Sequence, residues 1–121
     1  MPAPLISIID DGESMLQTLA GLLRFLGFDA RAYGSAEEFI QRGWGETFSC
    51  IITDIHMSGL GGIGLKRWLD NRASTVPVIM ITGRSDPQLH AQALASGAAC
   101  LLKKPFDADA LLASLKKADI G

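Results

Sequence analysis

The sequence has 121 residues, of which 48% are hydrophobic and 20% are charged, a length and balance typical of one globular domain with its own core. Eleven basic and thirteen acidic residues leave a formal charge of −2, too near neutral for a nucleic-acid-binding stripe or a membrane-surface patch. No apolar run approaches the roughly 18 residues of a membrane span, and the N-terminus lacks a signal-peptide pattern, so we expect a cytoplasmic protein.

The two cysteines, Cys50 and Cys100, lie far apart, and each opens a short apolar run. This placement favours buried free thiols over a disulfide or a metal site. The chain contains no internal repeat, low-complexity tract or linker. We therefore predict one domain over residues 1–121.

Hydrophobic runs and segments of helical periodicity alternate five times along the chain. Short apolar runs predict strands, and each is followed by apolar residues at helical spacing, first at Leu16, Leu19 and Leu23. The sequence therefore predicts five strand–helix units. The predicted strands cover residues 5–9, 28–33, 50–53, 76–81 and 98–102.

Local signals mark where several helices begin and end. Gly27, Gly43 and Gly97 stand where a C-terminal glycine belongs. Residues 35–38 have the spacing of a capping box, which predicts a helix start at Ser35. Residues 85–88 combine a serine cap, an early proline and a glutamine, which predicts another start.

The regular alternation predicts a three-layer (βα)₅ α/β fold, a doubly wound parallel sheet with helices on both faces. Runs one, three, four and five are nearly continuous in apolar residues, as in strands buried on both faces, whereas the run at 28–33 alternates like an edge strand. An edge position for the second strand fits the flavodoxin-like order 2-1-3-4-5. In that order, ligands bind between strands one and three, at their carboxyl ends.

Carboxylates follow the two strands that flank this switch point. Asp10 and Asp11 come after the first strand, and Asp54 ends the third. At an effective dielectric of about 20, two carboxylates about 5 Å apart repel by roughly 3 kcal/mol, so the cluster needs protons or a cation. Oxygen ligands without an accompanying His/Cys cluster favour Mg²⁺ over Zn²⁺ or an all-protein calcium cage.

Polar groups of another kind end the remaining strands. Thr82 closes the fourth strand, and Lys104 lies just beyond the fifth. A carboxylate nucleophile, a metal, a hydroxyl and a fixed positive charge are the groups that phosphoryl transfer requires. Asp54 is the natural acceptor because it is the single acid at its strand end.

This pattern resembles the receiver domains of two-component response regulators, a CheY-like family. The resemblance covers essentially the whole chain and rests on D-D after the first strand, a lone D ending the third, T-G after the fourth and K-P-F after the fifth. It implies that Asp54 accepts a phosphoryl group from a sensor histidine kinase or a histidine phosphotransfer protein. It also implies a domain that assists its own phosphorylation and dephosphorylation but is not a turnover enzyme.

The resemblance further implies which residues surround the acceptor. Asp11, Asp54 and the main-chain carbonyl of His56 would bind Mg²⁺, and Asp10 would assist, often through water. Thr82 would contact the phosphoryl oxygens. Lys104 would do the same, and its bond to Pro105 would be cis.

In such domains the new charge, about two negative units, changes a binding face made by the fourth helix, the fifth strand and the fifth helix. That face is also a candidate homodimer interface. The resemblance implies control of an attached or separate effector such as a transcription factor, without direct nucleic-acid binding by this domain. Because the sequence stops directly after the fifth helix, we expect a stand-alone regulator or the front of a longer one.

Several positions depart from the family pattern. Leu101 stands where an aromatic switch residue is usual, so the usual coupled rotation of a tyrosine or phenylalanine cannot occur. Ser58 stands where a proline is common, and the four glycines between 59 and 64 give a loop with a permissive backbone. His56 and Arg84 occupy the two variable positions that flank the phosphorylation pocket.

The same residues allow other interpretations. A degenerate receiver, acting as a phosphorylation-independent interaction module, would explain Leu101 and Ser58. The run G-L-G-G-I-G at 59–64 fits a dinucleotide-binding fingerprint, but no acid follows near 79–84 to hold a ribose. A carboxylate-nucleophile phosphatase usually has a second acid where this chain has His56. The pair at 10–11 could also only cap the first helix.

Overall fold

The computed structural model describes residues 3–83 and 85–120. Five parallel strands form one sheet in the order β2-β1-β3-β4-β5, and a helix follows each strand. The predicted fold class and strand order are therefore confirmed. The elements are β1 (Leu5–Ile9), α1 (Glu13–Phe25), β2 (Asp29–Tyr33), α2 (Ala36–Arg42), β3 (Cys50–Asp54), α3 (Gly62–Asp70), β4 (Val78–Thr82), α4 (Pro87–Ala95), β5 (Cys100–Lys103) and α5 (Ala108–Lys117).

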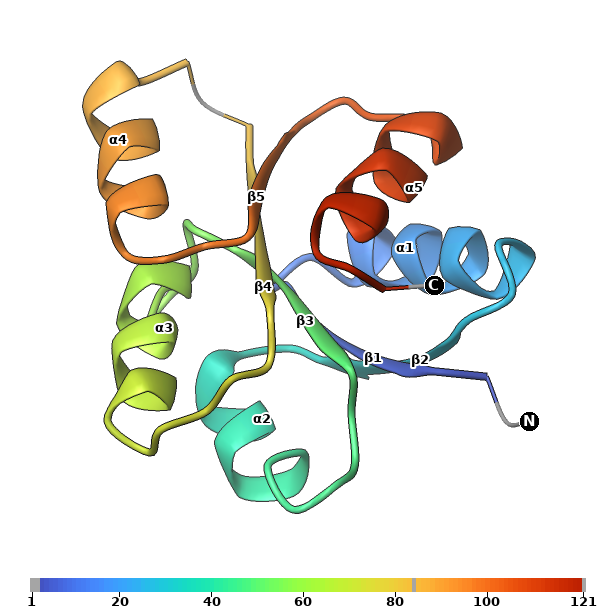
Figure 1. Ribbon diagram of the computed structural model, residues 1–121, viewed down its shortest axis with the longest axis horizontal. Coiled ribbons are helices and arrows are strands. Elements are labelled where there is room, and N and C mark those ends of the chain that lie inside the picture. The colour runs from blue at the N-terminus through green and yellow to red at the C-terminus, as the bar shows by residue number, and fades with distance from the viewer. Residues whose placement is uncertain (1–2, 84, 121) are drawn as a thin grey trace.

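Helices cover both faces of the sheet, α1 and α5 on one side and α2, α3 and α4 on the other (Figure 1). Successive side chains of a strand point to opposite faces, so each central strand supplies both cores. Ile8 and Ile52 belong to the core beneath α1 and α5, whereas Ile9 and Ile51 belong to the core beneath the other three helices. This double burial explains the continuous apolar runs in the sequence.

The two edges of the sheet are β2 and β5. β2 pairs with β1 alone and is largely exposed, which confirms its predicted edge position. The prediction that the fifth strand is buried on both faces is wrong. β5 pairs with β4 alone, and Leu102 is its one buried residue, because no further strand covers its outer side.

Two kinds of local signal locate the helix ends correctly. The hydroxyl of Ser35 caps α2 by accepting a hydrogen bond from the backbone N–H of Glu38 at 3.0 Å. Gly27 and Gly97, directly beyond the caps of α1 and α4, both have a φ of +96°. That conformation is accessible to glycine at little cost and strained for other residues.

The start of α4 differs from the prediction by one residue. Asp86, and not Ser85, is the cap, and its carboxylate accepts hydrogen bonds from the backbone N–H groups of Gln88 and Leu89. A carboxylate is the stronger acceptor because its charge also interacts favourably with the positive end of the helix dipole. Ser85 and Asp86 both suit an N-cap, and the sequence prediction placed the cap one residue too early.

Both cysteines are free, as predicted, although Cys100 is only half-buried. Cys50 is fully enclosed in the core, and burial raises the pKa of its thiol to about 12. No helix in residues 3–83 or 85–120 is long and apolar enough to cross a membrane.

Two glycine substitutions test the packing of this fold. A β-carbon added at Gly21, on the exposed side of α1, meets no atom within 4 Å, so Gly21→Ala is expected to stabilise the protein by about 0.5–1 kcal/mol. A β-carbon at Gly62, in α3, would lie 2.7 Å from the carbonyl oxygen of Asp54, so Gly62→Ala is expected to destabilise it by about 1–3 kcal/mol. Urea unfolding measures both, and equal stabilities for the two variants would contradict this packing.

Candidate functional site

The candidate site lies where the strands end. Asp10 follows β1, Asp54 is the last residue of β3, Thr82 is the last residue of β4, and Lys104 follows β5. Neighbouring strands end at nearly the same level, since Thr82 pairs with Lys103 in the ladder. The parallel sheet therefore brings residues that are far apart in the sequence to one edge.

A lysine and two carboxylates converge at this edge. The ammonium Nζ of Lys104 lies 3.0 Å from Oδ2 of Asp54 and 3.5 Å from Oδ2 of Asp10. The carboxylate side chains are only 3% and 8% exposed for Asp10 and Asp54, whereas the lysine side chain is 27% exposed. Two acids against one cation leave this buried cluster with an excess of negative charge.

The carboxylate of Asp54 is held at both oxygens. Oδ1 accepts a hydrogen bond from the backbone N–H of His56 at 3.0 Å, and Oδ2 accepts one from Lys104. The backbone beneath is fixed as well, because every residue of β3 is buried, residues 51–53 pair with strands on both sides, and Asp54 itself pairs with Ile81 of β4. Asp54 is therefore presented in one orientation on a rigid strand end.

Asp10 accepts a hydrogen bond at one oxygen, and its other oxygen is in the 3.5 Å ion pair with Lys104. Its Oδ1 accepts a hydrogen bond from the backbone N–H of Gly12 at 2.8 Å, while its buried Oδ2 has no hydrogen-bond partner among the described residues. Burial raises the pKa of Asp10, and the neighbouring charge of Asp54 adds to that rise, against the opposing effects of Gly12 and Lys104. Neither Asp10 nor Asp11 is the N-cap of α1, because Gly12 occupies that position and no side chain makes the capping hydrogen bond.

The pKa of Lys104 is raised. Burial alone would lower it, but the hydrogen bond and charge of Asp54, together with Asp10, outweigh that effect. The ammonium is therefore charged throughout the physiological range, as a fixed positive group must be.

The third acid, Asp11, stays on the surface. In the described parts of the chain, no three Asp, Glu, His or Cys side chains are grouped so as to hold a metal ion. The two converging acids nevertheless suit a hard cation such as Mg²⁺, because Asp10 keeps a buried carboxylate oxygen without a hydrogen bond beside the carboxylate of Asp54.

The remaining predicted site residues lie around this cluster. Thr82 is fully buried at the end of β4, and its carbonyl oxygen accepts a hydrogen bond from the N–H of Lys104 at 2.8 Å. The peptide bond between Lys104 and Pro105 is cis, as predicted. His56 is half-buried, and Nε2 of its ring has no hydrogen-bond partner within the described residues. Arg84 lies outside them.

The glycine-rich loop after β3 folds back onto the strand that carries Asp54. A β-carbon at Gly61 would lie 2.6 Å from the carbonyl oxygen of Ile55, and Gly62 makes a similar approach to Asp54. These glycines therefore serve close backbone packing, which accounts for the fingerprint-like run without a dinucleotide.

Sequence reasoning missed one contact near the site. The Glu37 carboxylate of α2 accepts a hydrogen bond from the backbone N–H of Leu60, in the loop after β3, at 3.1 Å. The residues are 23 positions apart, and no local pattern signals that they meet. The only clue in the sequence was a second glutamate beside the capping residue Glu38.

Leu101 occupies an ordinary packing position. It pairs with Met80 in the sheet and is partly buried against the core beneath α2, α3 and α4, which also contains Ala93 of α4. The side chain fills space under α4 and has no polar atom with which to respond to Thr82.

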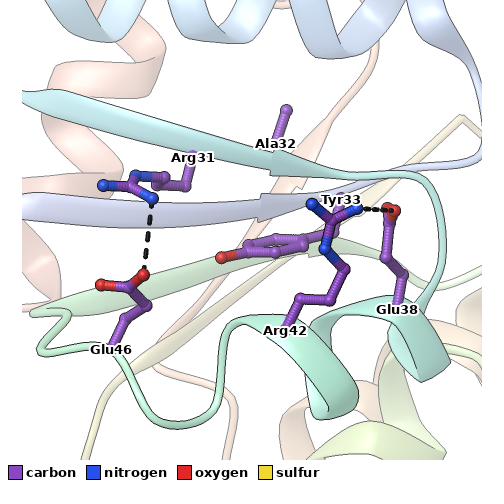
Figure 2. Close-up of a pocket in the computed structure, with 6 residues that line it drawn as sticks. All are labelled: Arg31, Ala32, Tyr33, Glu38, Arg42 and Glu46. Atoms are coloured by element: carbon purple, nitrogen blue, oxygen red, sulfur yellow. Dashed lines mark hydrogen bonds and ion pairs between the residues drawn. The ribbon is translucent and has the colours of Figure 1, made fainter.

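A pocket of about 250 Å³, which none of the cluster residues lines, lies at the β2 edge of the sheet (Figure 2). Tyr33 lies between two ion pairs, Arg31–Glu46 at 3.4 Å and Arg42–Glu38 at 3.8 Å. Each arginine is thus already matched by a glutamate, so the pocket has no unbalanced charge to attract an ion.

Comparison with known proteins agrees with this geometry. A family model described as the response regulator receiver domain matches residues 6–116. The transcriptional regulatory protein FixJ of Azorhizobium caulinodans is 36% identical over 117 residues, which cover 96% of this chain and 56% of FixJ. TdiR of Thauera aromatica, also a transcriptional regulatory protein, is 30% identical over 96% of this chain and 51% of its own. The chain thus spans about half the length of these curated relatives.

A solved structure of a relative has the same fold. The crystal structure of FixJ-N matches with a TM-score of 0.88 and 29% sequence identity, over 98% of this chain and 94% of that one. A receiver domain is not a turnover enzyme, which agrees with the prediction from sequence. The family match, the shared fold and the acid–lysine cluster at the strand ends lead to one conclusion: the chain belongs to the response regulator receiver domains of two-component signalling.

Proposed function

We propose that Asp54 accepts a phosphoryl group from a histidine kinase or a histidine phosphotransfer protein in a Mg²⁺-dependent reaction. The observation that carries the proposal is the lysine bridge, in which Lys104 lies 3.0 Å from Asp54 and 3.5 Å from Asp10 at the carboxyl end of the sheet. In this proposal, residues 1–121 form one receiver domain, which acts in the cytoplasm.

In the proposed reaction, a carboxylate oxygen of Asp54 attacks the phosphorus atom of the donor. A P–O bond forms, the P–N bond of the donor phosphohistidine breaks, and its electron pair returns to the imidazole. The Lys104 ammonium, already beside Asp54, then moves onto a phosphoryl oxygen, and the Thr82 hydroxyl donates to another. The N–H of His56, 3.0 Å from Oδ1 of Asp54, keeps the carboxylate oriented during attack.

The residues that would hold Mg²⁺ are Asp10, Asp11, Asp54 and the main-chain carbonyl of His56. When bound, the cation screens the negative charge of the carboxylate and phosphoryl oxygens. Asp10 contributes a buried oxygen that has no hydrogen bond among the described residues, and Asp11, which is exposed, is free to turn inward. The excess negative charge of the cluster favours this binding.

The consequence of phosphorylation would be a changed surface around α4, β5 and α5. About two added charges next to Lys104 and Thr82 alter the contacts between the ends of β4 and β5. We propose that this face binds a partner or a second copy of the domain. It would thereby control an effector such as a transcription factor, in line with the names of the relatives.

A second candidate function is favoured by Leu101. This leucine, partly buried against the core, stands in place of the aromatic side chain that usually couples the site to the output face. The domain would then act as an interaction module that does not depend on phosphorylation. Equal affinity for a partner with and without beryllofluoride would favour this alternative.

The acceptor residue can be tested directly. On incubation with Mg²⁺ and acetyl phosphate, the protein is expected to gain the mass of one phosphoryl group, and Asp54→Asn is expected to gain none, because an amide oxygen is a poor nucleophile. Intact-mass spectrometry measures both, and Asp29→Asn, an exposed carboxylate on β2, is the control expected to behave as wild type. Modification of Asp54→Asn to the same extent would refute the proposal.

The buried charge of Asp10 makes a second test. Burial raises the pKa of Asp10, so the folded protein disfavours the ionised carboxylate. The free energy of unfolding therefore falls as the pH rises from the pKa of Asp10 in the unfolded chain to its higher pKa in the folded protein. Without divalent cations at pH 7, Asp10→Asn is therefore expected to be about 1 kcal/mol more stable than wild type in urea unfolding.

The control for this test is Asp11→Asn, which changes an exposed carboxylate and is expected to shift stability by less than about 0.5 kcal/mol. Added Mg²⁺ is expected to stabilise wild type more than Asp10→Asn, since the variant lacks the second buried carboxylate. A cation-free Asp10→Asn protein that unfolds more easily than wild type would contradict this account.

A further inference from the structure

The carboxylate of Glu37 in α2 makes a hydrogen bond to the loop between β3 and α3. Oε2 of Glu37, in the first turn of α2, accepts a hydrogen bond from the backbone N–H of Leu60 at 3.1 Å. The contact joins two segments that the sheet brings together, since α2 and α3 lie on the same face (Figure 1).

The backbone of the loop is shaped to admit this carboxylate. Gly59 has a φ of +76°, a left-handed conformation that favours glycine. A β-carbon built on Gly59 would collide with the carboxylate of Glu37. Both the conformation and the missing side chain of Gly59 are therefore needed where Glu37 approaches Leu60.

The same loop orients the acceptor at its other end. The N–H of His56 donates to Oδ1 of Asp54 at 3.0 Å, and the N–H of Gly62 closes the loop by donating to the carbonyl of Ile55 at 3.2 Å. Because the loop is short and closed, restraining Leu60 also restrains the backbone that carries His56.

We infer that Glu37 is a positioning residue for Asp54, acting through Leu60 and the loop to hold the His56 peptide in place. Glu37 touches no reacting atom. The inference rests on the proposed function of Asp54, and it adds that phosphorylation depends on a glutamate of α2. In the proposed site, the main chain of His56 would supply both the N–H that orients Asp54 and a carbonyl ligand for Mg²⁺.

The neighbouring glutamate separates this role from a general effect on the helix. Glu38 is also in the first turn of α2, but its Oε1 accepts from the backbone N–H of Gly34 at 2.8 Å and so stays within the start of its own helix. Both carboxylates interact favourably with the helix dipole. Only Glu37 reaches the loop that follows Asp54.

The first experiment uses NMR amide hydrogen exchange on the cation-free protein. In Glu37→Ala, exchange at the N–H groups of Leu60 and His56 is expected to rise about fivefold or more, as for a lost hydrogen bond. Glu37→Gln, which keeps an acceptor oxygen, is expected to remain within about twofold of wild type. Glu38→Ala, the matched truncation, is expected to leave both amides unchanged.

The second experiment measures the rate of phosphorylation by acetyl phosphate over a range of Mg²⁺ concentrations. Glu37→Ala is expected to be slower by about three- to tenfold and to need more Mg²⁺, because the acceptor and its neighbouring carbonyl are less well fixed. Glu37→Gln is expected to recover most of the rate. Unchanged exchange at His56 in Glu37→Ala, or the same effects in Glu38→Ala, would overturn the inference.

The two experiments also separate this inference from the proposed function. If wild-type protein accepts no phosphoryl group, the proposed function fails, while the exchange data still decide whether Glu37 holds the loop. If wild type is phosphorylated and Glu37→Ala matches its rate, the positioning role fails and the proposed function stands.

Discussion

The structure depends on one buried interaction, the contact of the Lys104 ammonium with the carboxylates of Asp54 and Asp10. Two buried carboxylates this close together would repel each other strongly, and the lysine offsets only part of that repulsion. The proposed binding of a cation, and then of a phosphoryl group, would offset the negative charge that remains. Under the proposed function, binding of these ligands would lower the electrostatic free energy of the cluster.

The rest of the fold keeps these charges together. Asp54 and Lys104 are 50 residues apart, and their distance is set by the β3–β4–β5 ladder and by cores on both faces of the sheet. Because β3 is buried on both faces, Asp54 cannot move away from the lysine without breaking core packing. The loop after β3 is joined to α2 by the hydrogen bond between the Leu60 N–H and the carboxylate of Glu37.

Periodicity and strand-end chemistry were enough to predict the sheet order, the edge position of β2 and the placement of Asp10, Asp54, Thr82 and Lys104 at one edge of the sheet. The errors have local causes. β5 has an apolar sequence but only one neighbouring strand, and hydropathy does not report the number of neighbours. Ser85 and Asp86 both suit a cap, and only the backbone geometry decides between them. The outward position of Asp11 and the contact of Glu37 with Leu60 depend on side-chain directions and long-range packing, which sequence spacing does not encode.

The two edges of the sheet differ in a way that affects self-association. An open edge strand offers unpaired backbone groups to any other strand, and charged side chains oppose such contacts. Two ion pairs, Arg31–Glu46 and Arg42–Glu38, lie beside β2 (Figure 2). A strand added at this edge would remove water from these charged side chains, which is unfavourable. Pairing of this edge with a strand of another molecule, and the open-ended association it would allow, is therefore disfavoured.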